Sequence, residues 1–140
     1  MTDTETQLPG PYSALVRALF SDPRHVVSGP AASGSQPEVR VAESVAGAQI
    51  LLSAVTQNDV LVSLRFRVFG CPHLVAAAEW CCERYEGGPV NKMGDFDVPR
   101  LMETLGVPIE KFGRILLLED AIRSLCSQID SASGNQERKG

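Results

Sequence analysis

The chain has 140 residues, of which 44% are hydrophobic and 21% charged, and its formal net charge at pH 7 is -4. This length supports one compact domain but not two independent cores, and the composition excludes a wholly disordered, collagen-like or coiled-coil protein. The acidic balance removes the general electrostatic reason to bind a phosphate backbone, so we expect no nucleic-acid partner.

We do not expect the start of the sequence to be a secretory signal. Residues 1–9 are polar and acidic, without the basic start and apolar stretch of a secretory signal. No apolar run approaches the roughly 20 residues that span a bilayer. We therefore expect a cytoplasmic protein that does not bind membranes, with a flexible tail over 1–9, one domain over 10–130 and a second flexible tail over 131–140.

The first element expected along the chain is a short amphipathic helix. Apolar residues recur at helical spacing within 10–26, and Pro23 limits how far this pattern continues. The stretch 27–37 mixes Gly, Ser and Pro with small residues and has no apolar period. That composition predicts an exposed and mobile connection.

Three strands are expected next, because the apolar period changes to two. Val39 and Val41 alternate with polar neighbours, 49–55 forms the second candidate strand, and 60–69 forms the third. In the third strand the residues expected to share one face are Val60, Val62, Leu64, Phe66 and Val68. This alternation predicts a half-buried antiparallel sheet.

The helical period returns from Leu74 onward. One continuous apolar stripe is formed by Leu74, Ala77, Ala78, Cys81, Cys82 and Tyr85. A short helix is expected to begin near Val98 and a last helix near Pro108. The order of elements predicts an α+β fold in which helices pack on one face of a three-stranded antiparallel sheet.

Cys71 is the residue whose position most suggests chemistry. It follows the third strand and precedes the Leu74 helix, where loops expose side chains and a helix N-terminus favours a thiolate. Two interpretations are open: a nucleophilic or metal-binding thiol, or a small residue fitted into a tight turn. His73 could approach the same metal or hydrogen-bond the thiol, although an exposed histidine at a helix start is the commoner case.

The remaining polar candidates favour structural roles. The four cysteines should be thiols in a reducing compartment, and Cys81, Cys82 and Cys126 lie on apolar stripes, which predicts burial. Glu119 and Asp120 are adjacent, so they point in different directions and favour a solvated edge over an acid/base pair. No phosphate-binding loop, nucleophile elbow or dinucleotide motif is present, so we expect no catalytic residues and no enzymatic activity.

Several segments share the pattern of one known family. They are Tyr12-Ser13, Asp22-Pro23-Arg24-His25-Val26, Phe66-Arg67-Val68-Phe69-Gly70-Cys71, Leu105-Gly106-Val107-Pro108-Ile109-Glu110-Lys111 and Leu118-Glu119-Asp120-Ala121-Ile122. Together they resemble the U-type iron-sulfur cluster scaffold family, IscU and the N-terminal domain of NifU. The resemblance covers about 12–129 and implies the same order of elements.

The resemblance also implies a site that this chain has altered. The family holds a nascent 2Fe-2S cluster, or zinc in its place, with three cysteines aided by a histidine and an aspartate. The middle cysteine matches Cys71, but the first cysteine and the aspartate fall on Val45 and Gly47, and the His-Cys pair falls on Gly113 and Arg114. These four residues supply no thiolate, so the ligand positions they occupy are lost.

The residues that remain lead to a modified expectation for the site. Cys71 and His73 are the candidate metal ligands, yet we expect no stably bound cofactor, although the resemblance implies a cluster or zinc as the group such a site would take. Arg114 is instead a candidate for binding an anion or a partner. The surface at these positions should form a partner- or anion-binding patch and not a metal cage.

Two functions follow from the resemblance. The first is a divergent iron-sulfur cluster assembly protein that docks on a cysteine desulfurase or another assembly protein, or accepts sulfur at Cys71, without stable cluster binding. The alternative is a non-catalytic interaction module or complex subunit that reuses the fold and has lost the metal chemistry. A third interpretation, an enzyme with Cys71 as nucleophile assisted by His73 or Arg114, lacks an evident acid/base partner.

Overall fold

The computed structural model describes residues 12–27, 38–45 and 47–139, with side chains described through residue 131. The expected tail 1–9 and most of the connection 27–37 lie outside these residues. The elements are α1 (Ala14–Ser21), β1 (Glu38–Val45), β2 (Ala48–Gln57), β3 (Val60–Phe69), α2 (Pro72–Tyr85), η2 (Val90–Asp95), α3 (Val98–Leu105), η3 (Ile109–Lys111) and α4 (Phe112–Lys139). Their order confirms the predicted α+β fold.

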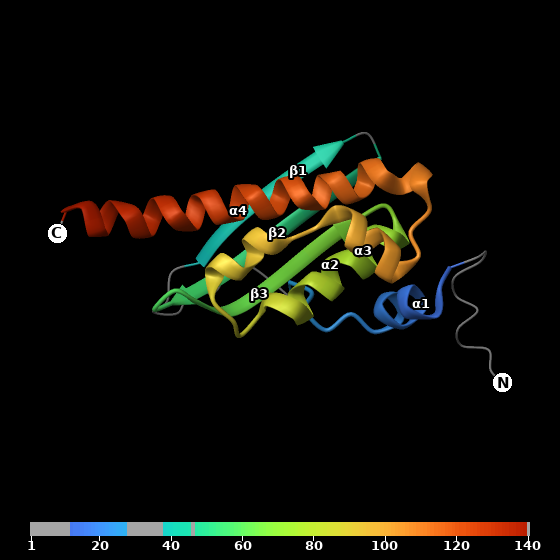
Figure 1. Ribbon diagram of the computed structural model, residues 1–140, viewed down its shortest axis with the longest axis horizontal. Helices are drawn as coiled ribbons and strands as arrows, with labels where there is room; N and C mark the ends of the chain where they lie inside the picture. The colour runs from blue at the N-terminus through green and yellow to red at the C-terminus, as the bar shows by residue number, and fades with distance from the viewer. Residues whose placement is uncertain (1–11, 28–37, 46, 140) are drawn as a thin grey trace.

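The sheet is antiparallel throughout, with strand order β1-β2-β3. Helices α2 and α4 pack over one face, α4 against β1 and β2 and α2 against β3 (Figure 1). Alternate residues of the strands point into this layer, so that Leu52 and Phe66 are register partners and both are buried in the core. We call the opposite side, which carries Leu51 and Arg67, the outer face.

The predicted face of β3 is correct in its second half and wrong at its start. Leu64 and Phe66 are buried as expected, but Leu61 is buried while Val60 and Val62 are exposed. The cause is an irregularity of pairing between β2 and β3, where Val62 is an extra residue without a register partner. A bulge of this kind reverses the faces of the residues that precede it.

Ser13 joins the start of α1 to the end of α3. Its hydroxyl oxygen accepts the backbone N–H of Val16 at 3.1 Å, as an N-cap residue does, and its O–H donates to the carbonyl of Leu105 at 2.7 Å. Gly106 lies directly beneath, because a Cβ there would be 3.4 Å from the Ser13 Cβ. Two of the segments that carry the family resemblance are therefore in contact.

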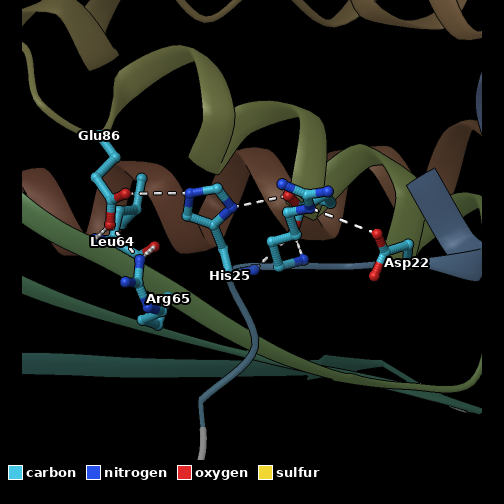
Figure 2. A network of polar contacts seen from close by, with 7 residues as sticks. Asp22, His25, Leu64, Arg65 and Glu86 are labelled. Atoms are coloured by element: carbon cyan, nitrogen blue, oxygen red, sulfur yellow. Dashed lines mark hydrogen bonds and ion pairs between the residues drawn. The ribbon is translucent and has the colours of Figure 1, made fainter. Parts of the chain in front are cut away.

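A polar network attaches the segment after α1 to α2 (Figure 2). Glu79 of α2 is 0% exposed, and one of its carboxylate oxygens accepts the backbone N–H groups of Arg24 and His25 at 2.9 Å each. The other oxygen lies 2.7 Å from Nδ1 of the His25 ring. A buried carboxylate thus receives the three hydrogen bonds that it needs in order to remain charged.

The same network continues from His25 to β3. Nε2 of His25 lies 3.1 Å from one oxygen of Glu86, and the other oxygen accepts the backbone N–H of Leu64 at 2.8 Å and pairs with Arg65 (Figure 2). The backbone of His25 also accepts the N–H of Phe66 at 2.8 Å. This segment therefore covers part of the free edge of β3.

The last helix is longer than expected. It begins at Phe112, after a single 3-10 turn that follows Pro108, and continues through Lys139 past the end of the sheet (Figure 1). The helix therefore extends beyond the end of its apolar stripe, through 131–139, and the flexibility expected over 131–140 stays a prediction. In the part of the chain that the structure describes, no helix combines the length and apolarity needed to cross a membrane.

Candidate functional site

Three segments meet at one end of the sheet, and we call this meeting point the corner. They are the β1–β2 turn at Gly47, the β3–α2 junction at Gly70 and the start of α4 at Arg114. A Cβ on Gly70 would lie 2.6 Å from the carbonyl oxygen of Gly47, and a Cβ on Gly47 would lie 3.4 Å from Nη2 of Arg114. Both glycines have positive φ, +128° and +83°, so the backbone conformation disfavours a side chain at either position, and at Gly70 the close carbonyl excludes one as well.

Cys71 is the N-cap residue of α2. Its carbonyl oxygen accepts the backbone N–H groups of Leu74 and Val75 at 3.0 Å each, and Pro72 takes the first helical position. The side chain is 6% exposed, so the expected presentation at a loop surface is wrong. The residue belongs to the core cluster, and only Gly70 separates it from the end of β3.

His73 is also buried, with 4% of its surface exposed. The expectation of an exposed histidine at a helix start is therefore wrong. Its ring centroid lies 4.7 Å from that of Tyr12, and neither ring nitrogen has a hydrogen-bond partner among the described residues. Burial lowers the pKa of His73 below its ordinary value, the charge of Lys111 lowers it further, and Glu110 opposes both. The ring is therefore held in its neutral form at pH 7.

Arg114 brings a guanidinium group to the corner. Its guanidinium lies against Gly47, at the position where the family resemblance aligns the aspartate. Gly113 adds no contact, since a Cβ there would meet no heavy atom within 4 Å, and Val45 is an exposed apolar residue at the end of β1. Of the patch expected from the sequence, the structure documents the approach of Gly47 to Arg114.

The donor set at the corner does not fit a cluster or a zinc ion. Within the described ranges, no group of three or more His, Cys, Asp or Glu side chains is placed to hold a metal. Thiolate-rich sites require several converging ligands. Cys71 and His73 thus supply at most a partial set, and their role as ligands stays a prediction.

The other cysteines follow their predicted positions with one exception. Cys81 and Cys82 are buried in the core, and burial raises the pKa of both thiols. Cys126 is only half-buried, which corrects the expectation of burial, because it borders a hollow of about 440 Å³ between η2 and α4. Burial and the nearby charge of Asp130 raise the pKa of Cys126.

The adjacent carboxylates of α4 are separated as expected. Glu119 pairs with Arg123 one turn later at 3.3 Å, and Asp120 is exposed. The buried Glu79 network was not anticipated. The sequence signal that could have indicated this network is the position of Glu79, directly beside the apolar stripe of a helix expected to pack on the core.

Comparison with known proteins gives a consistent result. The family model described as NifU-like N terminal domain matches residues 11–132. The chain is 24% identical over 123 residues to the iron sulfur cluster assembly protein 1 of Trachipleistophora hominis, covering 88% of this chain and 89% of that protein. It is 29% identical over 112 residues to the iron-sulfur cluster assembly protein IscU of Plasmodium falciparum, covering 80% of this chain and 69% of the relative.

A solved structure shares the fold. It is a candidate iron-sulfur cluster assembly scaffold protein for the SUF system from Fervidobacterium islandicum, which superimposes with a TM-score of 0.61 over 82% of this chain and 96% of that one. The sequence identity is 14%, so this likeness concerns the fold alone.

Proposed function

Because the chain belongs to the NifU-like N-terminal domain family of iron-sulfur cluster assembly scaffolds, we propose that it serves that assembly as a docking protein that keeps no stable cluster of its own. Membership of this family supports a role in iron-sulfur cluster assembly. The observation that carries the finer proposal is the Arg114 guanidinium lying against Gly47 at the corner.

Arg114 changes what the corner can bind. A guanidinium is protonated at all accessible pH values, and its planar donors match a carboxylate, a phosphate or another anion. It would repel ferrous iron, and Cys71 is the one cysteine among the residues that the sequence places at this corner. The corner is therefore suited to an anionic group of a partner protein, such as a cysteine desulfurase or another assembly protein.

Sulfur acceptance at Cys71 is the chemical step that such docking would allow. The Cys71 thiol releases its proton to solvent, and the thiolate attacks the outer sulfur of a persulfide on the partner. A new S–S bond forms on Cys71 while the partner's S–S bond breaks and its thiolate leaves. Since Cys71 is 6% exposed, docking must first uncover it. The transfer is stoichiometric, so the chain acts as an acceptor and not as an enzyme.

Anaerobic reconstitution tests the absence of a stable cluster. The full chain is incubated with ferrous iron and sulfide and then desalted, alongside Cys71→Ser and the control Cys126→Ser. We expect no retained iron and no 2Fe-2S absorbance in any of the three. A stoichiometric cluster in the wild type that is lost only in Cys71→Ser would contradict the proposal.

A second candidate function is a pure interaction module, which the incomplete ligand set within the described residues also favours. A sulfur-transfer experiment distinguishes the two functions. A cysteine desulfurase supplied with 35S-cysteine is mixed with the chain, and labelled peptides are mapped. Label on Cys71 supports sulfur acceptance, whereas a stable complex without label supports the interaction module. A cytoplasmic location is part of the proposal, although a relative from Yarrowia lipolytica, 29% identical over 77 residues, is named as mitochondrial.

A further inference from the structure

The outer face of the sheet holds a hollow of about 480 Å³ that the proposed function does not use. Two neighbouring rows of register partners form it. The first row is Ala42, Leu51 and Arg67, and the second row is Ser44, Gln49 and Phe69. Helices α2 and α4 cover the opposite face (Figure 1), and every residue of the two rows except the half-buried Leu51 is exposed.

Arg67 gives this surface its charge. It is exposed, and in the described part of the chain it makes no ion pair or hydrogen bond. The other two arginines of the outer face are both neutralised, Arg40 by Glu38 at 3.0 Å and Arg65 by Glu86. The unpaired cation therefore lies in the row that also contains Leu51.

One carboxylate borders the hollow without neutralising Arg67. Glu43 and its register partner Ile50 both line the hollow. In a strand they alternate with the residues of the two rows, and Ile50 is buried in the core, so their side chains point to the helix-covered side. The alternation therefore directs the charge of Glu43 away from the two rows.

Phe69 supplies an apolar platform in the second row. It is 71% exposed, and it lies on the same face as the half-buried Leu51. A single exposed hydrophobic residue is common on protein surfaces, but an aromatic ring bordering a hollow beside an unpaired arginine is a combination that binding surfaces favour.

We propose that the outer-face hollow binds an extended, acidic segment of a partner protein. A carboxylate of the segment pairs with Arg67, and an aromatic or aliphatic residue packs on Phe69. Adjacent rows lie two residues apart along each strand, or roughly 7 Å, which is the spacing of side chains i and i+2 in an extended peptide. The recognised pattern is therefore acidic-x-apolar. A nucleic acid is disfavoured because the chain has a net charge of -4.

NMR titration of the full 15N-labelled chain tests this surface. The probe is the peptide acetyl-Gly-Ser-Asp-Ser-Phe-Ser-Gly-amide, and its controls replace Asp by Lys or Phe by Gly. We expect saturable amide shifts at both rows with a dissociation constant in the millimolar range or tighter. Both control peptides should bind about tenfold more weakly. An absence of saturable shifts at these rows, or equal binding of the Lys peptide, would overturn the proposal.

Substitutions in the chain locate the binding. Arg67→Glu and Phe69→Ser should each weaken the peptide about tenfold, while Arg100→Glu, the same charge change at an exposed position on α3, should leave it unchanged. Arg67→Gln serves as a milder second variant if Arg67→Glu perturbs the sheet, and a dispersed spectrum verifies folding. Equal effects of the Arg67 and Arg100 substitutions would refute the assignment. So would an eight-nucleotide thymidine oligomer that binds the two rows more tightly than the peptide.

Discussion

Replacement of Glu79 by glutamine tests how the 22–27 segment is held to the core. The wild-type carboxylate is fully buried and is reached by the N–H groups of Arg24 and His25 at 2.9 Å and by the His25 ring at 2.7 Å. Glutamine keeps one carbonyl oxygen for the two backbone donors. Toward the imidazole it presents a neutral amide N–H₂ group in place of the carboxylate oxygen.

The size of the effect follows from these contacts. A hydrogen bond to a charged group contributes about 1.5–3 kcal/mol, so the loss of the His25 contact should destabilise Glu79→Gln by about that amount. Glu79→Ala removes the acceptor of the two backbone N–H groups, the His25 ring and the Glu83 side chain, and it should cost about 3–5 kcal/mol, as does the removal of one member of a buried pair. For a chain of this size each kcal/mol lowers Tm by roughly 3–5 °C.

Urea unfolding followed by circular dichroism measures the difference. The matched control is Glu103→Gln, an exposed glutamate on α3, which should change the free energy of unfolding by less than about 0.5 kcal/mol. If Glu79→Gln is no more destabilised than Glu103→Gln, the network does not hold the segment and the reasoning fails.

The stability difference between the wild type and Glu79→Gln should depend on pH. Burial would raise the pKa of Glu79, but hydrogen bonds from the His25 side chain and backbone and from Glu83 outweigh it, and the pKa lies below the ordinary value of 4.5. A lowered pKa in the folded state gives stability that is present above the unfolded pKa and lost as pH falls through the folded one. The wild-type advantage over Glu79→Gln should therefore shrink below about pH 4.5.

Glu83 acts in the opposite sense and must be controlled. Burial and the hydrogen bond to Glu79 raise the pKa of Glu83, so its contribution is present at low pH and lost as pH rises through its folded pKa. Measuring Glu79→Gln in a Glu83→Gln background removes this titration, because glutamine has no ionisable group. The amide of the introduced glutamine can still donate a hydrogen bond to Glu79. An advantage that stays constant from pH 7 to well below 4.5 in that background would contradict the assignment.

The remaining predictions concern the thiols, the corner and metal removal. Under native alkylation and peptide mapping, Cys126 should react faster than Cys71, since Cys126 is only half-buried and Cys71 is 6% exposed. The reverse order would show that the corner opens in solution. Gly70→Ala should destabilise the chain by at least about 1–3 kcal/mol, because its Cβ would lie 2.6 Å from a carbonyl oxygen; Gly113→Ala, in open space on a helix, should be neutral or stabilising by about 0.5–1 kcal/mol. A chelator should leave Tm unchanged, and a drop that added zinc reverses would reveal a structural metal.

The order of elements was accessible from the sequence because each element has a clear apolar period. The stripe from Leu74 to Tyr85 is buried along its length, and α3 begins at Val98 as expected. The faces of Val60 and Val62 were not accessible, since 60–62 are all apolar and the period cannot decide between them. Pairing with β2, which is a non-local property, decides the register.

The altered ligand positions could be identified by resemblance, but the burial of the corner could not. Cys71 and His73 appear polar and loop-like in sequence, yet both are buried, and the ring of Tyr12, 61 residues before His73, lies against the His73 ring. Likewise the partners of Glu79 come from Arg24 and His25, more than fifty residues away. Contacts of this separation depend on the packing of α1 against α2 and leave no local pattern.

Isothermal titration of the full chain with a cysteine desulfurase tests the central claim most directly. Wild type, Arg114→Glu and the control Arg100→Glu are compared at the same ionic strength. The account predicts binding of the wild type and of Arg100→Glu with similar affinity, and a loss of about tenfold or more for Arg114→Glu, as expected when a charge-assisted contact is reversed. Binding of Arg114→Glu equal to that of the wild type, or no binding by any of the three, would contradict it.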